Sequence, residues 1–214
     1  LFILCKYPSV EKMKTIDLEC FEEIRKLSRN SFNLSKYYKF MNLLENTIGF
    51  SMPTSEFQLQ MYLNLLDEYN KQIKLLENEI INKVKEINPF FLSISGIGPL
   101  SAAVILAEYG NIHWFSNPGQ LLSFAGVEPS ISDSGTQSHT GHMVKHGSGY
   151  LRETLMNLIA PLILQNPVIS AYYYKKRSEG KSHRTASTHV VRKLLRYIFF
   201  LETHQMYYDP MKAK

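Results

Sequence analysis

The residues that most directly suggest chemistry lie in a Ser/Gly-rich stretch at 129–142. Ser134 stands directly before Gly135, so its hydroxyl is sterically open, and an exposed loop can deliver such a hydroxyl to a scissile phosphate. A serine hydroxyl alone is a weak nucleophile and needs a base, a metal or an electrostatic clamp, and the sequence places none beside it. On spacing alone, an ordinary turn is the favoured interpretation. Ser132 is the alternative nucleophile.

Three histidines follow in the same region, at His139, His142 and His146. Their spacing is typical of a metal site, but no cysteine or paired carboxylate completes a coordination shell, so we expect no metal here. With Lys145 and Arg152 nearby, neutral histidines would line a phosphate-binding surface. A loop facing solvent explains the same pattern equally well.

A second candidate contact is the turn formed by Gly96, Ile97 and Gly98, ahead of a small-residue helix that starts at Pro99. The turn resembles the hairpin of helix-hairpin-helix DNA-binding modules, where glycines let the backbone approach a phosphate and N–H groups at a helix start bind it. All three residues are predicted donors. The alternative is a tight turn that only packs Ile97 inward.

Cations and aromatic residues alternate near the C-terminus, in the segment 172–177 and at Arg192, Lys193 and Arg196. Residues 1–138 carry 12 Lys and Arg against 15 Asp and Glu, whereas residues 139–214 carry 12 against 4. A localised basic surface with tyrosines suits a nucleic-acid backbone. The alternative is that the tyrosines belong to the core and the cations reach outward to solvent.

The elements that must position these residues are predicted to be mainly α-helical. Apolar residues three and four apart predict helices within 16–48 and from Tyr62 to Ile87, which we expect to form an antiparallel, coiled-coil-like hairpin. Further helices are expected from Pro99, from Pro118, and over 150–165 with a kink at Pro161, 168–179 and 185–205. The predicted domains are a helical hairpin linker at 1–88 and a compact helical domain at 89–214 that contains the irregular serine loop.

Composition excludes several classes of protein. The longest apolar stretch, 155–164, is too short to span a bilayer, which needs roughly 20 residues. No signal peptide is expected, and we predict a cytoplasmic protein without a membrane partner. The two cysteines, Cys5 and Cys20, are expected to be free thiols.

Taken together and in order, the motifs resemble the C-terminal domain of the insertion-sequence 110/116/902 family of transposases, which includes the Piv-type DNA invertases. The resemblance covers about residues 90 to 210, and the segment at 16–88 is similar to the family's coiled-coil linker. It rests on Ser95-Gly96-Ile97-Gly98-Pro99, Phe115 with Pro118 and Gln120, Gly126 with Pro129, Ser134-Gly135, Gly141-His142 with Lys145 and Gly147, Leu151-Arg152, Arg192-Lys193-Leu194-Leu195 and Tyr208-Asp209-Pro210.

The resemblance implies a DNA recombinase in which Ser134 attacks a phosphodiester and holds one end as a phosphoserine. It also implies Mg²⁺ bound by four acidic residues of an N-terminal RuvC-like domain. Nothing similar to that domain precedes the linker, so we expect this chain alone to bind DNA without recombining it. Some family members are guided by a structured RNA, which points to RNA as a second partner in a nucleoid-associated bacterial or archaeal protein.

Two other functions are also compatible with the sequence. The first is a non-catalytic helix-hairpin-helix module that binds nucleic acid. The second is a coiled-coil assembly protein, because the exposed side of the helical seam could recruit a second chain and form a homo-oligomer. Covalent trapping on DNA separates a recombinase from a binding module, and loss of oligomerisation on removal of 54–88 would reveal the assembly role.

Overall fold

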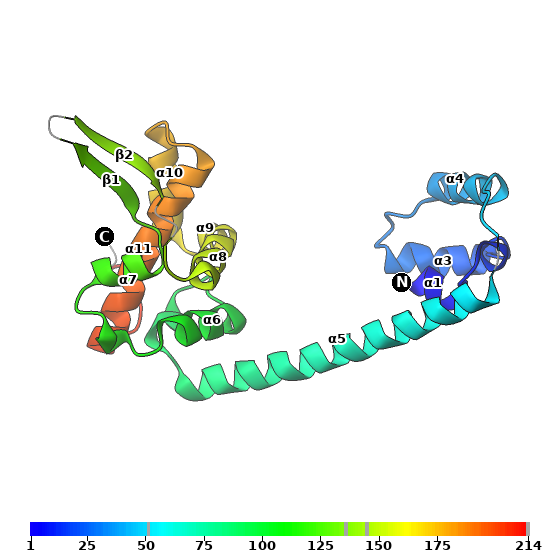
Figure 1. Ribbon diagram of the computed structural model, residues 1–214, viewed down its shortest axis with the longest axis horizontal. Coiled ribbons are helices and arrows are strands. Elements are labelled where there is room, and N and C mark those ends of the chain that lie inside the picture. Colours follow the sequence, from blue (N-terminus) through cyan, green and yellow to red (C-terminus); the bar gives the residue numbers. More distant parts are fainter. Residues whose placement is uncertain (51, 135–136, 144–145, 213–214) are drawn as a thin grey trace. The chain divides into compact units, whose positions relative to one another are not determined.

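A computed structural model describes residues 1–50, 52–134, 137–143 and 146–212, with the backbone alone at 129–134 and 137–143. This part of the chain is mainly helical, as predicted (Figure 1). The first five helices are α1 (Phe2–Lys6), α2 (Val10–Met13), α3 (Leu18–Leu27), α4 (Leu34–Glu45) and α5 (Pro53–Ile87). They are followed by η1 (Phe90–Ser93), α6 (Pro99–Tyr109), η2 (Ile112–Trp114), α7 (Pro118–Phe124), β1 (Pro129–Ser134), β2 (Gln137–Met143), α8 (Gly149–Asn157), α9 (Ile159–Gln165), α10 (Pro167–Ser178) and α11 (His183–His204).

The chain divides into two compact units, Leu1–Leu75 and Leu76–Lys214. The division falls inside α5, whereas the sequence placed the domain boundary at the end of that helix, between 88 and 89. The first unit has a small core of its own, formed by Ile16, Cys20, Phe21, Ile24 and Tyr37. The Tyr37 hydroxyl donates to the Ile16 carbonyl at 3.1 Å, so this buried hydroxyl has a hydrogen-bond partner.

The helices expected at 16–88 are present, but they pair differently from the predicted hairpin. Arg29 and Asn30 have positive φ and separate α3 from α4, so these helices pack on each other, with the Phe21 and Tyr37 rings 5.0 Å apart. The seam of α5 is exposed instead, and Val84 is its only buried residue among those described. A heptad pattern predicts an apolar face but does not specify which element covers it. The sequence alone did not show that α3 and α4 would bury their apolar faces against each other.

The second unit is built around α11, whose apolar side is buried from Ala186 to Leu201. The C-terminal segment packs back on η1, because the Tyr208 N–H donates to Ser93 Oγ at 2.8 Å. In α11, Glu202 Oε1 accepts the Phe91 N–H at 3.0 Å. These two contacts join η1 to α11 and to the segment that follows it.

The helix predicted at 150–165 is divided into α8 and α9 at Leu158. Proline lacks an N–H, and its ring clashes with the carbonyl four residues earlier, which for Pro161 is that of Asn157. The interruption at Leu158 lies N-terminal to Pro161, as this clash requires. Proline at the first helical turn also starts α6, α7 and α10, at Pro99, Pro118 and Pro167.

The Ser/Gly-rich stretch, predicted as an irregular loop, contains an antiparallel two-stranded ladder in place of a loop. Its register pairs Pro129 with Met143 and Ser134 with Gln137, with an irregularity between Pro129 and Ile131. The prediction failed because the stretch has no alternation of apolar residues, while backbone pairing needs none. Figure 1 shows β1 and β2 running outward from the helices of the second unit.

Among the described residues, no single helix is long and apolar enough to cross a membrane. One bent pair passes a test of length and composition, 149–165 with Pro167–Ser178, at an angle of 107°. Residues of that pair, including Leu151, Leu155, Leu162 and Ile169, lie in the core of the second unit.

Candidate nucleic-acid site at the root of a hairpin

Ser134, the predicted nucleophile, is the last residue of β1, where the ladder pairs it with Gln137. Ser132, the alternative, pairs with His139. The side chains of both serines, of His139 and of His142 lie outside the described part of the chain, as does all of Lys145. Their roles stay predictions, whereas the residues that hold the hairpin at its root are described.

Two arginines hold the segment that leads into β1. Arg152 Nη1, on α8, donates to the Ala125 carbonyl at 3.1 Å. Arg192 Nε, on α11, donates to the Val127 carbonyl at 2.6 Å. Burial, and then the charge of Arg196, lowers the pKa of the Arg192 guanidinium, although an arginine stays protonated in a protein. Both residues were predicted to contact phosphate, and in this structure each binds the backbone at the root of the hairpin.

The segment that leaves β2 is held by close packing. Gly147 has φ +95°, and a Cβ at this position would lie 2.0 Å from the Phe124 carbonyl oxygen. The Ser148 N–H donates to that same oxygen at 2.8 Å, and Ser148 Oγ donates to Glu108 Oε2 at 2.5 Å. His146, a predicted contact, is exposed next to this anchor. Both ends of the hairpin are therefore bound to α6, α7, α8 and α11.

The turn at 96–98 is only partly open to a ligand. A Cβ on Gly96, which has φ +104°, would lie 2.9 Å from the Leu162 Cα. Ile97 is buried, and its N–H donates to the Ile94 carbonyl at 3.1 Å. Gly98 is exposed at the N-cap of α6, with nothing within 4 Å of the place a Cβ would take. Of the three predicted donors, Gly98 is the one with room for a phosphate.

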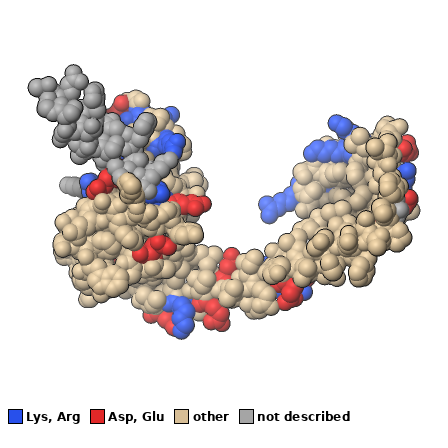
Figure 2. Space-filling model, in the orientation of Figure 1, with Lys and Arg blue, Asp and Glu red and all other residues tan. Residues whose placement is uncertain are grey.

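The aromatic residues and cations of α10 and α11 form one cluster. Lys193 Nζ lies 4.6 Å from the Tyr172 ring centroid and 5.4 Å from that of Tyr197. Lys176 Nζ lies 5.5 Å from the same Tyr172 ring. Arg196 is exposed on α11. The two interpretations of the sequence are therefore compatible, because the half-buried tyrosines form a floor on which the ammoniums sit. Figure 2 shows Lys and Arg side chains gathered over this part of the unit.

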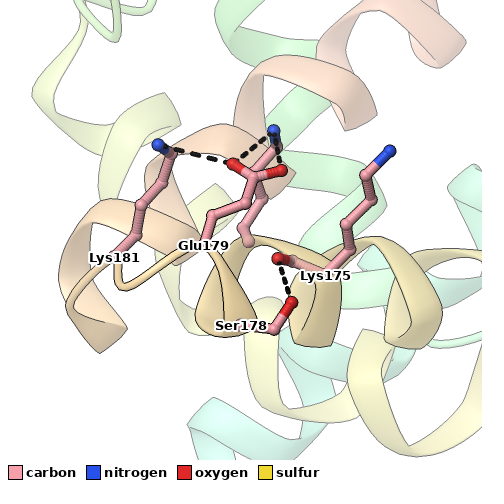
Figure 3. Close-up of polar contacts among 5 residues, drawn as sticks. Lys175, Ser178, Glu179 and Lys181 are labelled. Carbon is pink, nitrogen blue, oxygen red and sulfur yellow. Dashed lines mark hydrogen bonds and ion pairs between the residues drawn. The ribbon is translucent and has the colours of Figure 1, made fainter.

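One carboxylate lies within this cluster. The Glu179 carboxylate accepts from Lys176 Nζ at 2.9 Å and forms an ion pair with Lys181 Nζ at 3.4 Å (Figure 3). The hydrogen bond from Lys176 is the main cause that lowers the pKa of Glu179. Neither Glu179 nor Lys181 was singled out from the sequence. The signal was that residues 166–200 contain eight Lys and Arg and a single acidic residue.

The pKa of His189 is affected by the charges of this cluster. Burial is the first cause that lowers its pKa, followed by the charges of Arg192, Lys176 and Lys181, while Glu179 opposes them. These cations come from α10, α11 and the turn between them, so their fields converge on one imidazole. The sum of these charges is positive, as a surface for phosphate requires.

Metal-ligating side chains do not gather in the described part of the chain, where no group of three His, Cys, Asp or Glu is placed to hold an ion. His139 and His142 are not among the side chains described. The described residues do not bring together the acidic side chains that a Mg²⁺ ion prefers.

Part of the site lies in a range that is similar to a known protein family. Residues 88–174 match the family model described as Transposase IS116/IS110/IS902. Over this range the chain is similar to the transposase domain of that family. It is 26% identical over 146 residues to the 43.6 kDa protein of insertion element IS110 from Streptomyces coelicolor, covering 67% of this chain and 36% of that protein. It is 27% identical over 149 residues to the 44.8 kDa protein of IS116 from Streptomyces clavuligerus, covering 65% of this chain and 37% of that protein.

The alignments span just over a third of the length of these two relatives. Within this chain, the matched range of the transposase domain contains the 96–98 turn, the hairpin and Arg152, whereas Arg192, Lys193 and Arg196 lie C-terminal to it. The resemblance identified from sequence motifs is thereby confirmed at the level of the family.

Proposed function

We propose that this chain is the DNA-binding, serine-carrying part of an insertion-sequence recombinase. The observation that carries the proposal is a hairpin, in a transposase-family domain, that holds Ser134 on a root fixed by Arg152 and Arg192. A nucleophile must be held at a defined distance from its target phosphorus. A hairpin anchored at both ends supplies that constraint better than an unstructured loop.

In the proposed reaction, Ser134 Oγ loses its proton and forms a bond to a backbone phosphorus, while the bond from phosphorus to one deoxyribose oxygen breaks. That oxygen leaves as a hydroxyl, and the strand end stays on the serine as a phosphodiester. Attack by a hydroxyl of the exchanged strand reverses the step and releases the serine. Cations near the scissile phosphate would stabilise the charge that develops on its oxygens.

The partners and the metal follow from the same proposal. DNA is the substrate, a guide RNA is a second expected partner, and Mg²⁺ would be bound by acidic residues outside the part described here. We place the activity in the cytoplasm, in association with the nucleoid. Homo-oligomerisation through α5 is part of the proposal, because its seam residues Leu66, Ile73, Leu76 and Ile80 are exposed.

Covalent trapping tests the serine chemistry. A version extended to the full length of the relatives is incubated with plasmid DNA that carries the coding region and its flanks, then analysed on a denaturing gel. We expect a protein–DNA adduct that disappears with Ser134→Ala and persists with the matched variant Ser132→Ala. An adduct that survives Ser134→Ala would assign the nucleophile elsewhere, and loss with Ser132→Ala alone would assign it to Ser132.

A further inference from the structure

We propose that Lys175, Lys176, Lys181, Lys193 and Arg196, here called the α10–α11 cluster, bind the phosphate backbone of duplex DNA, and that Glu179 lowers this affinity by occupying two of their ammoniums. The inference rests on the proposed function only in taking DNA as the polyanion. It assigns to Glu179 the role of an internal competitor for phosphate.

The geometry of Glu179 supports competition. Both of its carboxylate oxygens lie 2.9 Å from Lys176 Nζ, and one of them lies 3.4 Å from Lys181 Nζ. A phosphate bound by these ammoniums would take the position of the carboxylate, since both are oxyanions that accept charge-assisted hydrogen bonds. The Lys176 side chain is only 18% exposed, so its ammonium is held in place beside Tyr172 and does not move freely in solvent.

The turn between the helices fixes this arrangement. Arg177 Nη1 donates to the Lys181 carbonyl at 2.7 Å, and Gly180 continues the chain with φ +79°. Glu179 and Lys181 therefore stand on a closed turn directly after α10. Lys193 reaches the same Tyr172 ring from α11, which brings a further ammonium to the cluster.

Stabilisation of the helix end is the competing explanation. Cations in the last turn of α10 interact favourably with the helix dipole, and an ion pair between residues three apart stabilises a helix. That explanation accounts for Lys175 and Lys176. It does not account for Lys193 and Arg196, which lie mid-helix in α11, or for a single acidic residue among the eight cations of 166–200.

Duplex DNA is the occupant that the observations favour. The cluster lies in the same compact unit as the hairpin, and Arg192 joins the two features by holding the hairpin root from α11. A duplex whose strand reaches Ser134 would extend across neighbouring surfaces of that unit. Ammoniums act as point charges and suit a continuous phosphate backbone, without need for base contacts.

Fluorescence anisotropy with this chain and a labelled duplex of arbitrary sequence, over a series of salt concentrations, tests the inference. Glu179→Gln keeps the shape and removes the charge. If this substitution lets one more ammonium contact a DNA phosphate, the slope of log affinity against log salt becomes steeper by about 0.9. The affinity at 0.1 M salt then rises about eightfold. The matched control is Glu153→Gln, which removes an exposed carboxylate from α8 and should change the affinity less than twofold.

A variant that lacks both lysines shows whether their ammoniums cause the gain in DNA affinity. In the double variant Lys176→Gln and Lys181→Gln, adding Glu179→Gln should raise the affinity less than twofold. The inference is overturned if Glu179→Gln gives no gain, if the gain is the same without the two lysines, or if the gain appears for an RNA duplex and not for DNA. Because no covalent step is measured, failure here leaves the serine chemistry intact. Conversely, if the extended protein formed no adduct through Ser134, the proposed function would fail and the affinity result would still hold.

Discussion

A methyl group added at Gly147 should detach the root of the hairpin. With φ +95° this residue adopts a conformation that L side chains rarely take, and its Cβ would lie 2.0 Å from the Phe124 carbonyl oxygen and 2.8 Å from the carbonyl carbon. Those atoms belong to the backbone and cannot rotate away. In Gly147→Ala, the chain must shift until the Ser148 N–H loses its bond to Phe124.

The expected cost has two parts. A non-glycine residue in this region of φ costs about 1–3 kcal/mol, and loss of the backbone hydrogen bond costs about 1 kcal/mol more. The total is about 2–4 kcal/mol of the free energy of unfolding of the second unit. For a unit the size of Leu76–Lys214, 3 kcal/mol corresponds to a fall in Tm of about 10 °C.

Circular dichroism melts measure this fall, and hydrogen exchange locates it. The Ser148 amide should exchange much faster in Gly147→Ala than in the parent protein. Gly149→Ala is the matched control two residues on, where the nearest atom to the new Cβ is Arg152 Nη2 at 3.8 Å. That variant should be as stable as the parent or slightly more so, because alanine favours a helix. A Tm for Gly147→Ala within about 2 °C of the parent would refute the close packing on which this reasoning depends.

Three further predictions concern other parts of the chain. Gly98→Val should weaken binding to duplex DNA in the anisotropy assay while leaving the melt unchanged, because space is open at this position; unchanged affinity would favour a turn that only packs. Burial is the main cause that raises the pKa of Glu202, so its carboxylate destabilises the fold as pH rises above about 4.5. Glu202→Gln should therefore gain stability over the parent between pH 4 and 7 in urea titrations, and a constant difference would contradict this. If α5 forms the interface, the double variant Leu66→Glu and Ile73→Glu should be a monomer in light scattering where the parent is an oligomer. A parent chain that is already monomeric at high concentration would exclude that role.

The helix boundaries of the second unit could largely be predicted, because local chemistry determines them. Gly110 ends α6 with φ +63°, and Asn117 caps the start of α7 by accepting the Gln120 N–H at 3.1 Å. Such signals act over three or four residues and are visible in the sequence. The helical periods at 16–48 and the end of α5 before Pro89 were found in the same way.

The strands could not be predicted, because their stability comes from pairing across the hairpin. Apart from Ile131 and Met143, the paired positions hold polar residues or proline, so no apolar alternation marks them. Gly135 between the two runs was the available signal, since glycine favours the tight connection of a hairpin. The runs beside it lack the apolar alternation of strands, so the sequence predicts a loop at this glycine.

The positions of the cations required the structure, and they explain why arginine and lysine are used differently. Arg152 and Arg192 bind main-chain carbonyls at the root of the hairpin, where several N–H groups in a fixed plane can hold a direction. Lys176 and Lys193 lie over aromatic rings, and the Lys176 ammonium binds an oxyanion, the Glu179 carboxylate. From sequence, all four were equivalent positive charges near tyrosines. The fold separates them into two that bind the hairpin root and two that lie on the surface proposed to bind DNA. Replacing Arg192 with lysine should therefore disturb the hairpin even though the charge is kept.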